Sequence, residues 1–509
     1  MEKEKKFMII GILILLITLV GTAGTYAWFT WSSTSNTNLT MSIGASSDVI
    51  FKNGNDISTN KLAPVFNYTD GEKTSFTITN KSTTSFSYRI LLNITSIDNE
   101  LKNKSLKYKL VSNNTIITEG DFSSIESINT LYKGKLFKGS SDYIFYLYID
   151  GNEENDLKII GKSLSGTIKV EETPLLAQYI TDMYTNATKT ASSISDGITY
   201  NYARSINLMN DRLGSSSVGL NDGNIRYYGA DPNNYIYFNC IDYNNQTSDT
   251  CEIWRIIGVF DGKVKIMRNE SIGAYSWDNK NTSTGAENNN GKNDWTTARL
   301  MKLLNPSDYY AVDSNDNGNG QSLYWNTKSG TCFSGQNNAT TACDFTSIGL
   351  KNDITKSLII ENDWNIGNSP SALLYVSQIY QNERGTTVYS GRPINWIGKV
   401  TLPYLSDYGY AVDLRKCGGY VSSYFNSSCT LNNWMKNIIT NNGSNAGWTL
   451  TANPNYSYYS DYVDSGGKSN TDKGTYPSYE VVPTIYLISN LKIDINTNGS
   501  FSNPFKLFI

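Results

Sequence analysis

The chain has 509 residues, a formal net charge of −3 and a sequence pI near 5.4, and its length allows two or three domains. Charged residues make up only 17% of it and no basic cluster follows the first six residues, so nucleic acid is not expected as a partner. The sequence contains no histidine, which excludes Ser-His-Asp and Cys-His catalysis and zinc sites with histidine ligands.

The first 28 residues have the pattern of an export signal. Met1–Lys6 is rich in lysine, and Phe7–Tyr26 is a largely apolar stretch of 20 residues, about 30 Å long as a helix and able to cross a bilayer core. Because the positive end stays inside, the rest of the chain is expected outside the cell, at the surface. Two outcomes remain open: residues 1–28 are a signal peptide cleaved near Ala27, or residues 7–26 stay in the membrane as an anchor.

Residues 29–172 are predicted to form an all-β sandwich. Ser75–Thr79 alternates polar and apolar side chains, whereas Tyr143–Ile149 is apolar on both faces and rich in strong β formers. Turn clusters such as Asn53–Asp56 and Asp150–Asn152 separate the strands. Strands at this spacing indicate packed antiparallel sheets.

The segment Gly24–Thr30 resembles the signal and maturation site of the TasA- and camelysin-type matrix proteins of Gram-positive bacteria. Phe76–Asn80, Glu119–Phe122 and Tyr146–Asp150 fall in the order that this family would place them. The resemblance covers about the first 170 residues and implies a jelly-roll-like sandwich that can assemble into fibres. Camelysin-type proteins have been linked to metalloprotease activity, which we do not carry over because this chain lacks histidine.

Residues 173–197 are predicted to be a helical connector between domains. Thr173 can cap a helix that has Pro174 at its first position. Apolar residues then follow at helical spacing, namely Leu175, Leu176, Tyr179, Ile180 and Met183.

Residues 198–509 are predicted to form an α+β domain, because helical and strand patterns are mixed along them. Asp261-Gly262 between two apolar runs predicts a hairpin, and Asn293–Pro306 predicts a helix. Further helices are expected around Leu350–Leu358, Ser371–Tyr380 and Trp434–Ile439, and further strands at Trp448–Leu450 and Val481–Leu487.

The aromatic side chains of this domain are divided between core and surface by their context. Trp254, Trp295 and Trp448 fall within regular elements and are expected in the core. Tyr408–Tyr410 and Tyr456–Tyr458 have a loop-like context and are expected to be exposed.

The six cysteines lie in three close pairs, and none precedes residue 240. In an exported chain such pairs predict disulfides, and although fifteen connectivities exist, we expect sequential pairing. A metal site is the alternative, but the CxxC-type spacing that it needs is absent. The predicted disulfides are Cys240–Cys251, Cys332–Cys343 and Cys417–Cys429.

The second half also resembles uncharacterised surface domains of gut Firmicutes and Mollicutes, which look related to the Fibrobacter major paralogous domain. That relationship implies a C-type-lectin-like core over residues 198–509 and no settled activity. In the final strand, Val482 stands where those surface domains more often have arginine. Any role of that arginine is therefore not carried over to this chain. The segments that carry the resemblance are Trp254–Val259, Trp295–Asn305, Gly447–Leu450, Val482–Leu487 and Asn498–Leu507.

One string resembles the opening of a calcium loop. Asp313–Gly318 fits the pattern D-x-[DN]-x-[DN]-G, so Asp313, Asn315 and Asn317 are candidate calcium ligands. The twelfth position is Tyr324 rather than the usual bidentate glutamate, which makes this a weak site, and no other cofactor is expected.

Together these patterns predict an exported bacterial surface protein that recognises a glycan or a protein ligand through its C-terminal domain, in adhesion. We find no catalytic motif and do not expect an enzyme. Two alternatives remain: a matrix-fibre subunit that self-assembles through the sandwich, and a secreted glycosidase that uses two carboxylates. The acids available for the latter, which no spacing pairs, are Glu252, Glu270, Asp278, Glu361, Asp363 and Glu383.

Overall fold

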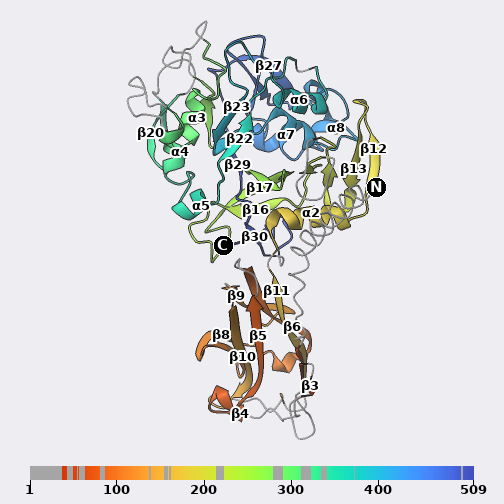
Figure 1. Ribbon diagram of the computed structural model, residues 1–509, viewed down its shortest axis with the longest axis vertical. Helices are drawn as coiled ribbons and strands as arrows, with labels where there is room; N and C mark the ends of the chain where they lie inside the picture. Colours follow the sequence, from red (N-terminus) through yellow and green to blue (C-terminus); the bar gives the residue numbers. More distant parts are fainter. Residues whose placement is uncertain are drawn as a thin grey trace, which may run out of the picture. The chain divides into compact units, whose positions relative to one another are not determined.

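Strands account for most of the regular structure, and helices are few and short (Figure 1). The chain divides into two units, Met1–Thr173 and Pro174–Ile509. The computed structural model describes residues 37–42, 50–53, 55–56, 64–80, 86–136, 139–153, 159, 162–172, 174–213, 223–278, 290–310, 322–333, 341–371, 373–494 and 497–509.

The predicted N-terminal segment, residues 1–28, lies outside the described residues, and so do the candidate calcium ligands Asp313, Asn315 and Asn317. In the part of the chain that the structure describes, no helix has the length and apolar character needed to cross a membrane.

The described strands of the first unit form two sheets. One has the order β3-β2-β1-β11-β6-β9, and the other has the order β4-β10-β7-β8, with β5 also paired to β10. The strands of the first sheet are β1 (Thr37–Ser42), β2 (Ile50–Asn53), β3 (Asn55–Asp56), β6 (Phe86–Ile97), β9 (Ile128–Leu136) and β11 (Ser163–Glu172). Those of the second are β4 (Pro64–Val65), β5 (Glu72–Asn80), β7 (Leu106–Ser112), β8 (Thr115–Asp121) and β10 (Gly139–Asp150).

The two sheets of the first unit share one apolar core, as the sequence pattern predicts for a sandwich. Phe145 and Leu147 come from β10, and Ile90 and Leu92 come from β6 in the other sheet; all four are buried. Because alternate side chains of a strand point to the same face, each of these pairs faces the opposite sheet. The short 3₁₀ turns Tyr68–Asp70 and Asn99–Leu101 lie between strands.

Two larger sheets and three two-stranded sheets make up the strands described in the second unit. One sheet has the order β12-β13-β14-β15-β17-β18-β29-β24, with β16 also paired to β17, and the other has the order β19-β28-β25-β26-β27. The strands of the first are β12 (Thr190–Ser193), β13 (Thr199–Ala203), β14 (Leu208–Asn210), β15 (Ile225–Tyr227), β16 (Tyr235–Phe238), β17 (Glu252–Phe260), β18 (Lys263–Arg268), β24 (Val400–Thr401) and β29 (Thr484–Tyr486). Those of the second are β19 (Ala274–Ser276), β25 (Gly447–Ala452), β26 (Tyr459–Val463), β27 (Ser469–Gly474) and β28 (Ser478–Glu480). The two-stranded sheets are β20 (Ser329–Cys332) with β21 (Thr341–Asp344), β22 (Asn362–Asn365) with β23 (Asn395–Gly398), and β30 (Lys492–Ile493) with β31 (Leu507–Phe508).

Short helices lie around these sheets. They are α2 (Leu176–Asn186), α3 (Arg299–Leu304), α4 (Leu323–Asn326), α5 (Asp353–Ser357), α6 (Val376–Glu383), α7 (Leu405–Tyr410), α8 (Ser427–Thr430) and α9 (Lys436–Ile439), with 3₁₀ turns at Arg204–Ile206, Ser307–Tyr309 and Val421–Ser423. Sheets and helices share a single large apolar core, in which Trp254, Trp295 and Trp448 are buried as expected.

The segment predicted as a connector belongs to the second unit. Its helix α2 begins at Leu176, packs against β17, β18 and β30, and buries Ile180 and Tyr184 in the large core. The backbone N–H of Leu176 donates to the carbonyl of Leu491 (2.8 Å), and β12 adds a strand to the nine-stranded sheet. These residues are therefore part of a folded domain.

Two local predictions have different outcomes. The hairpin at Asp261-Gly262 is confirmed: it joins β17 to β18 with φ values of 48° and 74°, as a tight two-residue turn requires. The helix predicted over Asn293–Pro306 is shorter and begins only at Arg299. The reason is that the Asp294 carboxylate accepts hydrogen bonds from the backbone and hydroxyl of Thr296, which stabilises a turn in place of the first helical residues.

The six cysteines form the three predicted sequential disulfides, Cys240–Cys251, Cys332–Cys343 and Cys417–Cys429. The second of them connects the two strands of the β20–β21 hairpin. Disulfides persist in oxidising compartments outside the cytosol, so this set indicates an extracellular environment.

Candidate functional site

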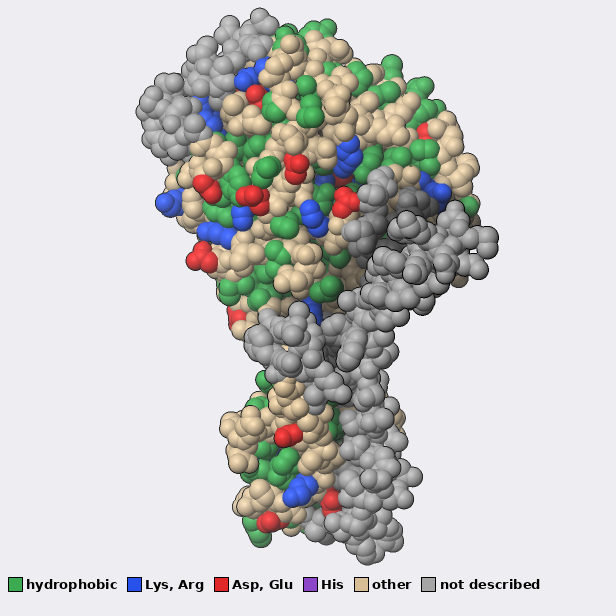
Figure 2. Space-filling view, viewed as in Figure 1, with side chains coloured by type: hydrophobic (Ala, Val, Ile, Leu, Met, Phe, Trp, Pro, Cys, Tyr) green, Lys and Arg blue, Asp and Glu red, His purple; other side chains and the backbone are tan. Residues whose placement is uncertain are grey.

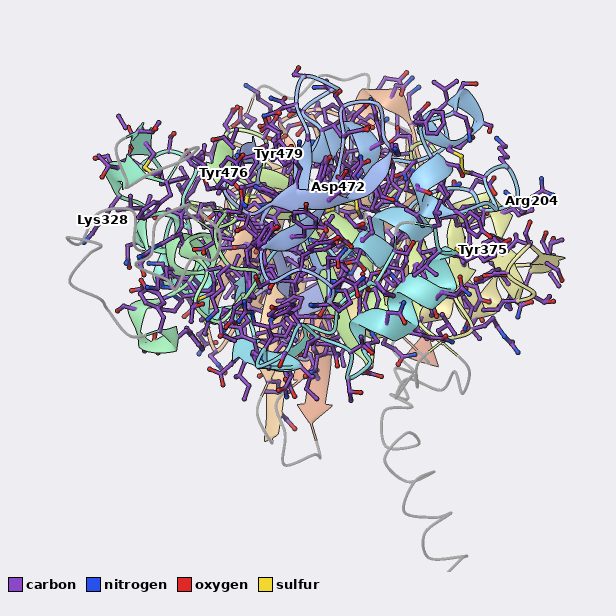
Figure 3. All side chains as sticks on the ribbon, turned by 90° about the horizontal axis from the view of Figure 1, so that it is seen from above. Arg204, Lys328, Tyr375, Asp472, Tyr476 and Tyr479 are labelled. Atoms are coloured by element: carbon purple, nitrogen blue, oxygen red, sulfur yellow. A yellow bond between two sulfur atoms is a disulfide. The ribbon has the colours of Figure 1, made fainter. Side chains whose placement is uncertain are left out.

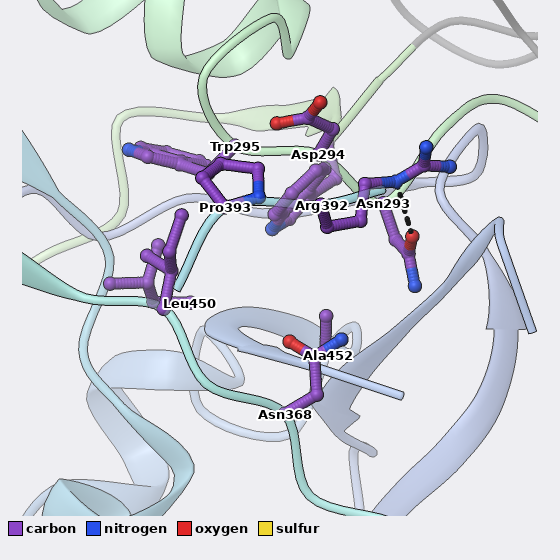
Figure 4. Close-up of a pocket in the computed structure, with 10 residues that line it drawn as sticks. Asn293, Asp294, Trp295, Asn368, Arg392, Pro393, Leu450 and Ala452 are labelled. Carbon is purple, nitrogen blue, oxygen red and sulfur yellow. Dashed lines mark hydrogen bonds between the residues drawn. The ribbon is translucent and has the colours of Figure 1, made fainter. Parts of the chain in front are cut away.

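The second unit contains a small pocket between the five-stranded sheet and four connecting segments (Figure 4). Leu450 and Ala452 of β25 form one side. The remaining lining comes from the segment after β19, the turn before α3, the segment after β22 and the segment before β23. These residues are Trp277, Asn293, Asp294, Trp295, Ile366, Asn368, Arg392 and Pro393.

Asn293 connects the pocket to the loop 453–459. Its side-chain Nδ2 lies 2.8 Å from the carbonyl of Tyr456 and 2.9 Å from that of Asn453, and its Oδ1 accepts a weak bond from Arg392 Nε (3.4 Å). Arg392 Nη2 in turn donates to the carbonyl of Ser457 (3.1 Å). These contacts hold the loop 453–459 beside the pocket.

The two charged side chains of the lining are directed away from its centre. Figure 4 shows the Arg392 guanidinium beside Asn293 and turned away from Asn368, so its aliphatic stem faces the pocket. The Asp294 carboxylate is turned away as well, and it is held by Thr296 and by Lys292 Nζ at 3.1 Å. Neither of these two charged groups is therefore directed into the pocket, which receives amide and indole groups and apolar side chains.

Two tryptophans form the aromatic wall. Trp277 and Trp295 are 1% and 2% exposed, and their rings meet edge to face with centroids 5.2 Å apart. Trp277 Nε1 donates to the carbonyl of Thr449 (3.1 Å). Trp295 Nε1, in contrast, has no hydrogen-bond partner among the described residues.

Asn368 supplies a second unpartnered donor. It is 3% exposed, its backbone N–H donates to the carbonyl of Thr387 (2.9 Å), and its side-chain Nδ2 has no partner within the described parts of the chain. Figure 4 shows the amide directed into the pocket. A buried donor without an acceptor costs about 1–3 kcal/mol. An acceptor oxygen placed in the pocket would remove that cost.

A buried charge cluster lies under the nine-stranded sheet. Arg226 Nε donates to Asp211 (2.6 Å) and its Nη1 donates to Asp407 (3.1 Å), while Lys265 Nζ also contacts Asp407. Burial lowers the pKa of Lys265 to about 8, against the attraction of Asp407. Burial alone would raise the pKa of Asp407, but the charges of Lys265 and Arg226 outweigh it and hold that pKa below its usual range. The cluster links β15 and β18 to α7.

Two further buried carboxylates lie close to β25. Glu383 accepts hydrogen bonds from the backbone N–H of Ser406 (3.0 Å) and the hydroxyl of Thr451 (2.7 Å). Neither carboxylate oxygen of Asp461 has a partner among the described residues. Burial raises the pKa of both groups, and the mutual repulsion of the two carboxylates raises that of Asp461 further. Both side chains are 0% exposed, so a substrate cannot reach them.

Three of the acids considered for glycoside hydrolysis have partners elsewhere. Glu252 pairs with Arg268 (3.0 Å), Asp278 accepts from the backbone N–H of Lys292 (2.9 Å), and Glu361 accepts from Tyr309 (2.6 Å). All six candidates are in the described part of the chain, and each lies outside the lining of the pocket.

No cluster of three or more acidic or cysteine side chains that could hold a metal ion occurs among the described residues. The candidate calcium ligands Asp313, Asn315 and Asn317 lie outside them, so that prediction stays open.

The prediction for exposed tyrosines is correct for Tyr456, whereas Tyr458 is half-buried and the prediction is wrong for Tyr408 and Tyr410. Tyr456 is 48% exposed, and its ring lies 4.5 Å from that of Tyr459 on the loop that Asn293 holds. Tyr408 and Tyr410 are buried instead, because their segment forms α7, whose Tyr408 hydroxyl donates to the carbonyl of Gly467 (2.6 Å).

A second aromatic surface lies on the five-stranded sheet. Tyr479 packs against Trp448 and Tyr462 at ring distances of 4.6 and 5.0 Å, and the Tyr462 hydroxyl donates to Asp472 (3.3 Å). Asp472, Tyr476 and Tyr479 lie in the same region in Figure 3. Among the described residues, Trp448, Tyr462 and Tyr479 leave no buried side-chain donor unpartnered, which makes the pocket the stronger candidate site.

Sequence reasoning placed Trp295 in the core but did not single out Asn368, Arg392 or Asn293. No local pattern marks them, because they come from separate loops that only the fold brings together.

Comparisons with known proteins leave the family open. No protein-family model matches the chain, and no curated protein matches it. Among solved structures, part of the chain is similar to a GH26-CBM35 β-(1,4)-mannanase from Podospora anserina, at 15% identity and a TM-score of 0.14. The match covers 30% of this chain and 34% of that one, and a similarity of this size supports no conclusion about activity.

Proposed function

We propose that the protein is an exported bacterial surface protein that recognises its ligand in the pocket of the second unit and serves in adhesion. The observation that carries the proposal is the pair of buried donors, Asn368 Nδ2 and Trp295 Nε1, in a pocket that two tryptophans border. Ligand pockets combine apolar and aromatic side chains with a few polar groups, and this lining contains Trp277, Trp295 and Leu450 together with the Asn368 amide.

The disulfides support the exported location. All six cysteines are paired, and all lie in the second unit. Together with the sequence of residues 1–28, they favour a protein of the cell surface, either anchored through residues 7–26 or released by cleavage near Ala27.

For the first unit we propose a jelly roll that acts as a stalk or an assembly unit. The strand orders β1-β11-β6-β9 and β5-β10-β7-β8 support a jelly roll, since two interleaved Greek keys produce this alternation of early and late strands between two sheets.

The same strand order favours a second candidate function, that of a fibre subunit, because a jelly roll agrees with the resemblance to the TasA-type matrix proteins. Filaments formed by the mature chain would support that function, and a chain that stays monomeric at high concentration would oppose it.

For the second unit we propose a C-type-lectin-like α+β fold, supported by two sheets with short helices and loops around them.

The alternative function of a glycosidase is disfavoured, because the neighbouring carboxylates Glu383 and Asp461 are completely buried.

A glycan and protein array probed with the full-length, disulfide-bonded chain tests the proposal. We expect binding that Asn368→Ala abolishes. Asn437→Ala, the same change at an exposed asparagine, should leave binding intact. An array without any hit, or hits that are indifferent to Asn368→Ala, would refute recognition through this pocket.

A further inference from the structure

We infer that Lys265 and Asp407 become joined by an amide bond between Lys265 Nζ and Asp407 Cγ, which the folded chain forms by itself from their buried ion pair. Three observations support this bond: the two side chains are in contact, water is excluded from them, and neighbouring donors hold the Asp407 carboxylate in place. The bond is independent of the ligand recognition proposed above.

The reacting groups already touch in the structure. Lys265 Nζ on β18 contacts Asp407 Oδ2 on α7, and the two residues are 142 positions apart in the chain. Both oxygens of the carboxylate are held: Arg226 Nη1 donates to Oδ1 (3.1 Å) and the backbone N–H of Tyr404 donates to Oδ2 (3.0 Å). Because folding has already brought amine and carboxyl together, their reaction avoids the entropy cost of an encounter.

Water is excluded from this ion pair. Both side chains are 0% exposed, whereas Figure 2 shows Lys, Arg, Asp and Glu side chains at the surface of both units. Condensation of an ammonium with a carboxylate releases water and removes two charges, so a dry site favours it and bulk water opposes it. Four aromatic ring centroids lie 4.2–5.6 Å from Lys265 Nζ, those of Phe260, Trp364, Tyr404 and Tyr486.

The charge cluster stays balanced after the reaction. Before it, the cations Lys265 and Arg226 are matched by the carboxylates of Asp211 and Asp407. The amide removes one charge of each sign, and Arg226 Nε keeps its hydrogen bond to Asp211 (2.6 Å). Of these four described side chains, none is therefore left with an unmatched buried charge.

The step conserves atoms and charge. Lys265 Nζ first passes a proton to Asp407 Oδ2, which gives a neutral amine and a neutral carboxylic acid. The amine then attacks Cγ, and Arg226 Nη1 stabilises the negative charge that develops on Oδ1. The Nζ–Cγ bond forms, the Cγ–Oδ2 bond breaks, and Oδ2 leaves as one water after taking a second proton from Nζ.

The protonation of the two groups determines the rate. Burial lowers the pKa of Lys265 to about 8, which brings the neutral amine within reach near neutral pH. Burial raises the pKa of Asp407, but the charges of Lys265 and Arg226 outweigh it and hold that pKa below its usual range. The neutral pair is therefore a minor species, and we expect the bond to accumulate slowly after folding.

Intact mass spectrometry of the full-length chain tests the bond. The folded protein is sampled at intervals until its mass is constant, and each sample is denatured and reduced before measurement. We expect the mass to fall below the sequence value by the mass of one water. A trypsin digest locates the loss: Val264–Arg268 should be recovered joined to Val400–Arg415, because trypsin does not cleave after an acylated lysine.

One variant and one internal control connect the loss to this pair. Lys265→Arg keeps the positive charge, but its guanidinium does not form this amide, so the variant should keep its full sequence mass. Lys107 and Asp150 of the first unit also form an ion pair (2.8 Å), but they are 24% and 17% exposed. Their peptides should be recovered unlinked.

The outcomes are unambiguous. A native chain that keeps its full sequence mass after incubation overturns the inference. So does a loss of water that persists in Lys265→Arg, because Asp-Gly dipeptides such as Asp261-Gly262 also lose water when they cyclise to a succinimide. If Lys265→Arg fails to fold by circular dichroism, the digest of the native chain decides alone, and the absence of the branched peptide refutes the bond.

Discussion

Asp461→Asn is expected to make the second unit more stable at neutral pH. Asp461 lies in β26 with no exposed surface, and its carboxylate has no partner among the described residues. Its pKa is raised well above the ordinary 3.8, by burial first and by the nearby Glu383 carboxylate second. The folded protein therefore holds a proton on Asp461 that the unfolded chain releases, and asparagine has nearly the same shape as the protonated acid.

The magnitude follows from proton linkage. Because the folded-state pKa is higher, the stabilisation by Asp461 is complete below pH 3.8 and is lost as the pH rises toward the folded-state pKa. Within that window the native chain loses about 1.4 kcal/mol per pH unit from this group. The asparagine of the variant does not titrate in this window. The free energy of unfolding of the variant should therefore exceed that of the native chain by about 1.4 kcal/mol more for each pH unit, and the difference should stay constant above the folded-state pKa of Asp461.

Urea unfolding of both proteins at half-unit pH steps from 3.5 to 8 measures this difference. Tryptophan fluorescence reports the second unit, since every tryptophan other than Trp28 and Trp31 lies in it. The control is Asp249→Asn at an exposed position, for which we expect a much smaller change. A difference between Asp461→Asn and the native chain that is independent of pH would refute the reasoning.

Two further predictions concern the charge cluster and the disulfides. Asp407→Ala leaves Arg226 and Lys265 buried with a missing counter-charge and should destabilise the second unit by about 3–5 kcal/mol in the same urea assay; a loss below about 1 kcal/mol would show that the cluster relaxes into solvent. Replacing Cys417 and Cys429 together by serine should cost about 3 kcal/mol, because the loop of the unfolded chain is no longer closed. Peptide mapping without reductant should recover these two cysteines in one disulfide-linked product, and recovery with any other cysteine would contradict the pairing.

Much of the local structure was predictable because short-range physics determines it. The Asp261-Gly262 hairpin depends on two adjacent residues with positive φ, and the disulfides join cysteines 11 or 12 positions apart. The pattern of Tyr143–Ile149 predicted a strand buried on both faces, and β10 is such a strand. The errors occurred where side chains from other segments decide, as for Tyr408 and Tyr410, whose loop-like sequence forms a buried helix.

The sequence by itself determined the mainly β character, the disulfide partners and the buried tryptophans, since strand periodicity, loop closure and the apolar character of a ring act over short distances. Only the tertiary structure decided the pocket and the charge cluster. Asn368 and Trp295 both line the pocket from separate loops, and Arg226 reaches Asp407 across 181 positions of the chain. The physical reason is that a buried polar group is defined by the partners that packing places around it, and these partners have no fixed spacing along the chain.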